Sequence, residues 1–264
     1  IDVSLADSMA ADRIRLWHDC VEYITSKEQS RYCGCSHCEK VESLSVATIS
    51  AHNYGIYLQQ LSKSVDAFNR EHLRWLVEST THASPNLASF IRVNDSTNYN
   101  YLENFTPVVG TETLPLIGPE SYNAPAIKRF RNRVVERYLP PLGKKIVILL
   151  PCSAKKPYSD SRSHRRIRQA IEGVIRGRDH AIAEVILTSP LGVVPRELER
   201  TFPANVYDIP VSGEWDNEEL EIGAKALVKH LSKFDANATI IAHVSGGYQE
   251  IVRRAEEGIA QKII

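Results

Sequence analysis

The sequence has no long apolar run and no leader-like start. None of its stretches approaches the ~18 consecutive apolar residues that cross a bilayer, so we expect no membrane span. The opening IDVSLADSMAADRIRLW lacks the basic and apolar regions of a secretory signal. It does not begin with Met, and we expect a chain cleaved or trimmed from a longer protein. With an ordinary hydrophobic content of 43%, these absences predict a globular cytoplasmic protein.

The sequence also lacks a net charge, because 32 basic residues balance 32 acidic ones. The charges are unevenly distributed, however. Between Lys128 and Arg178 there are 15 lysines and arginines against 3 acids, a local excess of +12 (15 − 3). An excess of that kind indicates a surface for nucleic acid or phosphate. The alternative is a set of solvated helix faces that acids from elsewhere in the fold neutralise.

Cysteine is scarce, and three of the five cysteines form one C-x-C-x-x-C run at Cys33, Cys35 and Cys38. Thiolates so close in sequence suit one tetrahedral ion better than disulfides to distant segments, and His52 would complete a ligand set typical of structural zinc. His37 is a competing ligand, and unliganded reduced cysteines are the alternative. Thiolates kept for a metal predict a reducing compartment, in agreement with the cytoplasm.

The first half of the chain predicts short strands, a long helical region and an irregular stretch. Alternating residues predict strands at 13–17 and 20–24, and apolar residues three and four apart predict helix from 52 to about 79. Residues 78–122 are polar and punctuated by proline, which predicts irregular structure. We therefore expect a zinc-binding domain at 1–80 and a linker at 81–125.

The second half, residues 126–264, alternates between helical and buried-strand patterns. Continuous apolar runs predict strands buried on both faces. Strands that alternate with helices predict an α/β domain with a parallel sheet and helices on both faces. The expected strands are 145–150, 183–188, 206–210 and 238–244, and the expected helices are 126–138, 163–175, 217–233 and 247–260.

A polar segment follows each expected strand. Because the carboxyl ends of parallel strands meet at one edge of a sheet, we expect these segments to form one pocket. The four segments are PCSAKKPYSDSRSH (151–164), SPLGVVPREL (189–198), VSGEW (211–215) and SGGY (245–248).

Cys152 is the candidate nucleophile of this pocket. Lysines, an arginine and a histidine follow it closely, and nearby cations favour the thiolate that attacks. The alternative is a small buried residue at a strand end. His164 is a candidate general acid or base, or else a helix-start histidine that faces water. Lys155 and Lys156 are candidates for binding phosphate, or else are solvated.

Other candidates in these segments also have structural alternatives. Tyr158 could stack on a base or pack in the core. Ser161 could cap the following helix. Arg196 could bind a ligand or pair with Glu197. His243 ends a strand beside two glycines, where it could meet a ligand or lie satisfied in the core.

Four segments resemble archaeosine synthases, in the family's order: RFRNRVVERYLPP, PCSAKKPYSDSRSH, TSPLGVVPREL and YDIPVSGEW. Upstream, CGCSHC and the later His52-Asn53 resemble the zinc site of tRNA-guanine transglycosylases, with a shorter gap after Cys38. The family's motif residues fall on Pro151, Cys152, Lys156, Pro157, Tyr158, Ser161 and His164.

The resemblance implies a zinc-binding, transglycosylase-like remnant followed by an α/β domain with a uracil-DNA-glycosylase-like fold. It implies an archaeal tRNA-modifying transferase that adds a nitrogen nucleophile to the nitrile of 7-cyano-7-deazaguanine at position 15 of tRNA. Lysine is the favoured amine donor, with glutamine or ammonia as alternatives, and a radical enzyme would cleave the adduct. A partner chain would supply the missing transglycosylase-like and PUA parts.

Joined to this resemblance, the local chemistry assigns roles to the candidates. Cys152 would add to the nitrile carbon, His164 would move a proton, and Lys156 would stabilise the thiolate. Two other functions remain open, a non-catalytic zinc-containing tRNA-binding subunit and base exchange by a tRNA-guanine transglycosylase. The predicted substrate-binding residues are Lys155, Tyr158, Ser161, Arg162, Arg196 and His243.

Overall fold

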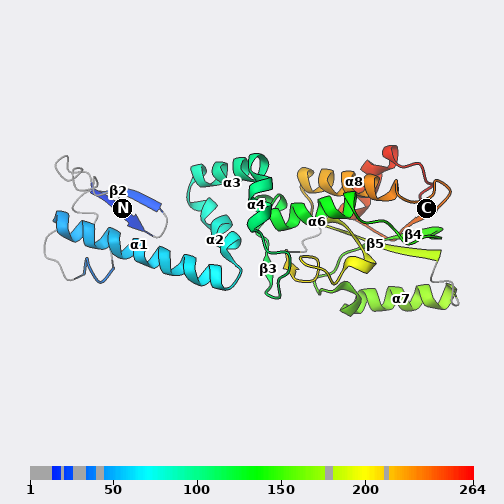
Figure 1. Ribbon diagram of the computed structural model, residues 1–264, viewed down its shortest axis with the longest axis horizontal. Coiled ribbons are helices and arrows are strands. Elements are labelled where there is room, and N and C mark those ends of the chain that lie inside the picture. Colours follow the sequence, from blue (N-terminus) through cyan, green and yellow to red (C-terminus); the bar gives the residue numbers. More distant parts are fainter. Residues whose placement is uncertain (1–13, 19–20, 26–33, 40–44, 176–180, 211–213) are drawn as a thin grey trace. The chain divides into compact units, whose positions relative to one another are not determined.

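The computed structural model describes residues 14–18, 21–25, 34–39, 45–175, 181–210 and 214–264. It divides into two compact units, Ile1–Ser89 and Phe90–Ile264 (Figure 1). Among the described residues, no helix is both long enough and apolar enough to cross a membrane.

The first unit contains an antiparallel strand pair and a long helix. Strand β1 (Ile14–His18) pairs with β2 (Val21–Thr25), so both predicted strands are confirmed within a residue. Helix α1 (Val46–Asn69) begins earlier than predicted because the Ser45 side chain accepts a hydrogen bond from the Thr48 amide at 3.2 Å.

The predicted helical region is interrupted after Asn69. Glu71 has a φ of 61°, a left-handed conformation that ends α1 before α2 (Leu73–Thr80) begins. The apolar positions that predicted α1 are largely exposed on this chain, whereas Ile49 and His52 on another face are buried. The exposed apolar side chains are Tyr54, Tyr57, Leu58, Leu61, Val65 and Phe68.

The stretch predicted to be irregular is mostly helical, so that prediction was wrong. It contains α3 (Pro85–Thr97), α4 (Tyr99–Phe105) and the short α5 (Pro119–Tyr122). The buried guanidinium of Arg129 donates to the carbonyl oxygens of Thr106 at 2.8 Å and of Pro107, and so satisfies backbone acceptors just after α4. The division at residues 80 and 125 stays a prediction.

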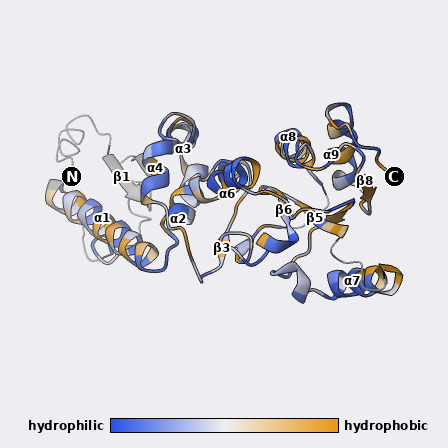
Figure 2. Ribbon diagram, turned by 45° about the vertical axis from the view of Figure 1, so that its right-hand side comes forward, coloured by the Kyte–Doolittle hydropathy of each residue, from blue (hydrophilic) through white to orange (hydrophobic). Residues whose placement is uncertain are grey.

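The second unit is built on a four-stranded sheet with the order β6-β5-β4-β8. Strands β4 (Ile146–Pro151), β5 (Ile182–Thr188) and β8 (Thr239–Ala242) are parallel, as predicted, with Leu149 opposite Val185 and Ala242. Helices α6 (Pro125–Glu136), α8 (Asn217–Leu231) and α9 (Gly247–Ala255) cover one face, and α7 (Arg162–Ile175) lies on the other (Figures 1 and 2).

Two expectations about this sheet were wrong. Residues 189–198 are not only a loop, because β6 (Gly192–Pro195) runs back antiparallel to β5. Gly192 allows this turn with a φ of 76°, and a Cβ there would lie 2.7 Å from that of Ala226. The expected third strand is shortened to β7 (Tyr207–Asp208), which pairs with β3 (Leu114–Pro115) in a separate sheet.

His230 is a polar side chain in an otherwise apolar core. Its exposed fraction is 0%, and neither ring nitrogen has a hydrogen-bond partner among the described residues. The ring instead stacks on Tyr138 at 5.6 Å and packs edge-on against Phe234. Burial, and then the charge of Lys233, lower the pKa of His230 to about 3.

We expect His230→Leu to raise the free energy of unfolding by ~1 kcal/mol at neutral pH, since it removes an unsatisfied polar group. The unfolded state takes up the proton near pH 6.5, before the folded state does, so His230 costs stability as the pH falls from about 6.5 toward 3. Urea unfolding at pH 7 and pH 5 measures both effects. The exposed His243, changed to Gln, is the control, and an unchanged pH slope in His230→Leu would contradict the argument.

Candidate functional site

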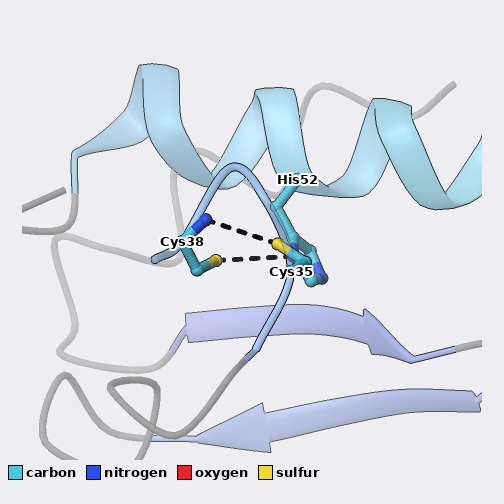
Figure 3. A group of neighbouring side chains, drawn as sticks. All are labelled: Cys35, Cys38 and His52. Carbon is cyan, nitrogen blue, oxygen red and sulfur yellow. Dashed lines mark hydrogen bonds between the residues drawn. The ribbon is translucent and has the colours of Figure 1, made fainter. Parts of the chain in front are cut away.

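Three potential metal ligands meet in the first unit (Figure 3). Cys35 and Cys38 lie in the described segment before α1, and His52 projects from α1 toward them. His52 Nδ1 is 3.0 Å from Cys35 Sγ and 3.5 Å from Cys38 Sγ. Cys33, the fourth predicted ligand, lies outside the described residues.

The chemistry of this cluster fits a metal. Two ligands of one tetrahedral zinc lie roughly 3.5 Å apart, given the usual Zn–S and Zn–N bond lengths. The Cys38 amide donates to Cys35 Sγ at 3.4 Å. Burial raises the pKa of the Cys35 thiol, but hydrogen bonds from His52 and Cys38 outweigh it and bring the pKa to about 7. His37 lies instead against α1, where a Cβ at Gly55 would be 3.0 Å from its Nε2.

A second site lies at the carboxyl end of β4. Cys152 follows the strand directly, and its Sγ is 2.9 Å from the hydroxyl oxygen of Tyr248 on α9. Burial raises the pKa of Tyr248 well above its usual value, so the phenol stays protonated and can donate to a thiolate. Two predicted segments, at 151–164 and 245–248, therefore do meet at this edge.

Trp215 covers the start of α9. Its ring packs edge-on against Tyr248 with centroids 4.9 Å apart. Gly247 makes this contact possible, because a Cβ there would lie 2.2 Å from Trp215 Cδ1. The adjacent residues 211–213 of the predicted VSGEW segment lie outside the described residues.

Lys156 contributes a buried ammonium group beside the same edge. Its Nζ lies 4.1 Å from the centroid of the Tyr207 ring and has no hydrogen-bond partner among the described residues. Burial lowers the pKa of Lys156, whereas the nearby Cys152 and Asp208 raise it. A buried cation with no hydrogen-bonding acceptor is costly, which makes it a ready receptor for an anion.

Tyr158 does not face a substrate, and its predicted stacking role was wrong. Its exposed fraction is 0%, and its hydroxyl lies 2.6 Å from that of Tyr207, which in turn contacts Thr188. The side chain is therefore part of the core, the structural alternative that the sequence left open.

His164 is also buried, and both of its ring nitrogens are engaged. Nε2 lies 3.0 Å from the carbonyl oxygen of Pro151, and Nδ1 lies 2.8 Å from a guanidinium nitrogen of Arg196. Burial, and then the charge of Arg196, lower the pKa of His164 to about 4. The ring is therefore neutral, with Nε2–H donating to Pro151 and Nδ1 accepting from Arg196.

Arg196 is held by carboxylates and does not project toward a ligand. It donates to Glu184 at 2.6 Å and to Glu199 at 2.9 Å, while its side chain is 13% exposed. The partners are thus Glu184 and Glu199, and not the neighbouring Glu197 that the sequence suggested.

The remaining predicted residues lie around the same segment. Ser161 caps α7, because its hydroxyl accepts from the His164 amide at 3.2 Å, and it is buried. Lys155 and Arg162 are exposed, as is His243 just after β8, which the sequence allowed to be a core imidazole.

Sequence reasoning missed several residues that shape this edge. Tyr248, Trp215 and Tyr207 were part of noted segments or strands, but no motif singles them out. Glu184 lies within a strand predicted to be buried on both faces, and a charged residue in such a strand was the available signal of an ion pair.

We expect Gly247→Ala to lower the free energy of unfolding by about 1–3 kcal/mol, because the new methyl group overlaps the Trp215 ring. Gly173→Ala is the matched control in α7. No described heavy atom lies within 4 Å of the added Cβ, so it should stabilise by roughly 0.5–1 kcal/mol. Thermal unfolding followed by circular dichroism compares the two, and equal stability would show that Trp215 is not fixed on Gly247.

Comparison with known proteins gives consistent matches. Residues 127–264 match the family described as Domain of unknown function (DUF5591). Archaeosine synthase subunit alpha of Thermococcus kodakarensis is 41% identical over 73% of this chain and 33% of that protein. Archaeosine synthase of Haloferax volcanii is 34% identical over 98% of this chain and 43% of that protein.

A solved structure of a protein of unknown function is 33% identical, covering 51% of this chain and 42% of that one, with a TM-score of 0.39. The chain spans a third to less than half of the length of these curated relatives. The chain belongs to the DUF5591 family and is a homologue of the archaeosine synthases.

Proposed function

We propose that this chain carries the nitrile-modifying site of an enzyme of archaeosine biosynthesis in tRNA. Its relatives are named archaeosine synthases, and the segment 151–164 supplies the family's motif. The substrate would be 7-cyano-7-deazaguanine at position 15 of tRNA, and the reaction would add an amine to its nitrile. Lysine is the favoured donor, with glutamine or ammonia as alternatives.

The observation that carries this proposal is the contact of Cys152 with Tyr248 at the carboxyl end of a parallel strand. Ligands bind at this edge of open α/β sheets. A thiol is a strong nucleophile once deprotonated, and the Tyr248 hydroxyl can donate to the thiolate. The buried ammonium of Lys156 adds positive charge near the same sulfur.

The reaction requires the thiolate and then the amine to add to the nitrile carbon, and the sulfur to leave. The Cys152 thiolate forms an S–C bond to the nitrile carbon, and the nitrile nitrogen takes up a proton, which gives a thioimidate. The amine then adds to the same carbon. Collapse of this adduct breaks the S–C bond, the sulfur leaves as thiolate, and the amidine remains. No oxidant or reductant is needed.

The geometry supports different roles for the other motif residues than the sequence indicated. His164 has no free ring nitrogen, so we assign it to holding the Pro151 carbonyl, and with it the backbone of Cys152, in place. Lys156 is the better candidate to supply positive charge or a proton at the nitrile nitrogen. The exposed Lys155, Arg162 and His243 are available for the RNA backbone.

The wider assembly belongs to the same proposal. The second unit would have a uracil-DNA-glycosylase-like fold, and the first would be the zinc-binding part of a transglycosylase-like domain. Transglycosylase-like and PUA parts would come from elsewhere in the enzyme, and a radical enzyme would act on the lysine adduct.

The central test uses tRNA that contains 7-cyano-7-deazaguanine and no added amine. We expect the wild-type chain to form a covalent protein–tRNA adduct, seen by denaturing electrophoresis and intact mass, and added lysine to discharge it as modified tRNA. Cys152→Ala abolishes the adduct. Lys156→Gln slows its formation roughly 100-fold, the usual effect of removing one charge-stabilising donor, and the exposed Lys225→Gln does not.

Two other outcomes would contradict parts of this proposal. Lysine addition by wild type and Cys152→Ala alike would show that the amine attacks directly and that Cys152 is structural. If the chain binds tRNA but forms neither an adduct nor a product, the result would favour the alternative function as a non-catalytic tRNA-binding subunit.

The cluster of Cys35, Cys38 and His52 should hold zinc, with Cys33 as the fourth ligand. We expect about one zinc ion per chain by elemental analysis, as for a closed four-ligand site. Cys38→Ser should lose most of it, whereas Cys152→Ser should keep it. An equal zinc content in both variants would show that this cluster does not bind the zinc.

A further inference from the structure

A cavity of about 630 Å³ lies beside α6, lined by residues from α6, the 108–110 segment and the 198–205 segment. Its volume is that of a typical small-ligand pocket. None of its described lining residues is acidic, and four of them are arginines: Arg129, Arg133, Arg137 and Arg200.

Three of these arginines form a row on one face of α6 and its C-terminal end. Arg129, Arg133 and Arg137 are spaced four residues apart, so they follow one another along the same side of the helix. Like charges at this spacing destabilise a helix unless an anion joins them. Burial, and then the charge of Arg133, lower the pKa of Arg129, while Glu103 and Tyr99 raise it.

The four arginines differ in the hydrogen bonds and ion pairs that they already make. Arg129 is buried and donates to backbone carbonyls of 106–107, which holds that wall of the cavity in place. Among the described residues, Arg133 pairs with Glu103 at 3.7 Å, and Arg200 on another wall pairs with Asp160 while 65% exposed. Arg137 is exposed and has no ion pair within the described part of the chain.

The rest of the lining is mostly apolar, and its polar side chains are those of Tyr138, Thr201 and Asn205. Val109 is 73% exposed at the rim, while Phe130 and Val134 form a buried floor. Asn205 also lines the cavity, and its buried Oδ1 has no hydrogen-bond partner among the described residues. An apolar surface suits a flat ring, and an unpaired amide suits a ring that carries hydrogen-bonding groups.

We propose that this cavity is a nucleotide-binding subsite, in which Arg133, Arg137 and Arg200 hold a phosphate, the apolar walls hold a base, and Asn205 bonds to the base edge. The nucleotide is either one residue of an RNA chain or a free nucleoside monophosphate. This inference does not depend on the nitrile chemistry, since it concerns binding at residues outside the Cys152 edge.

The test measures binding of guanosine 5′-monophosphate to the 264-residue chain by calorimetry. We expect ribose 5-phosphate, which lacks the base, and guanosine, which lacks the phosphate, each to bind at least about tenfold more weakly. Arg137→Gln removes a charge-assisted hydrogen bond, and Val109→Glu places an anion at the rim. Each should weaken binding of the monophosphate by about tenfold or more.

The control is Arg253→Gln, an exposed arginine of α9 outside the cavity lining, which should leave binding unchanged. Competition by tRNA would identify the natural ligand as an RNA residue, and its absence would identify a free nucleotide. No binding of the monophosphate at millimolar concentration, or equal binding by Arg137→Gln and the wild type, would overturn the proposal. Equal binding of ribose 5-phosphate and the monophosphate would also overturn the proposal, because it would show that the base makes no contribution.

Discussion

The edge of the sheet depends on one largely buried guanidinium, that of Arg196. It joins Glu184 of β5, Glu199 beyond β6 and His164 of α7, so three segments distant in sequence share one set of hydrogen bonds. Glu199 in turn accepts from the Ser159 amide at 3.0 Å. Removal of Arg196 would leave Glu199 without its cation and Glu184 with only the distant Arg168, at 4.0 Å among the described residues, so it would destabilise the fold.

That network explains how the position of Cys152 is fixed. Arg196 orients the His164 ring, and His164 donates to the carbonyl of Pro151, the residue before the cysteine. From the other side Tyr248 contacts the sulfur, and Trp215 packs against Tyr248. The backbone and the sulfur of Cys152 are thus held by separate elements, as preorganised chemistry at a strand end requires.

The sequence predicted those elements whose stability is local. The apolar runs of β4 and β5 and the acidic start of α8, where Asp216 and Glu219 form a capping box, carry their own signals. The helices α3 and α4 were missed because they are polar and because side chains more than twenty residues later in the chain satisfy carbonyls near their C-terminal ends. Lys128 donates to Asp95 O in α3, and Arg129 donates to Thr106 O and Pro107 O after α4. Strand β6 was missed because a turn at Gly192 against Ala226 depends on tertiary packing.

The sequence predicted which residue types lie near the candidate site, but not whether each side chain points into the core or toward solvent. The chain order placed Cys152 at a strand end, yet only the path of residues 152–164 decides that Tyr158 is buried and Lys155 is exposed. The same limit applies to charge. Of the basic run, Arg131 donates to Pro190 O at 2.8 Å and Lys144 to Ile182 O at 2.5 Å, so each is used to satisfy backbone carbonyls. The cations free to meet a polyanion are therefore fewer than the sequence suggests. Of the exposed ones, Arg162, Arg165 and Arg166 lie at the start of α7, Arg133 and Arg137 lie at the C-terminal end of α6, and Lys145 and Lys155 flank β4.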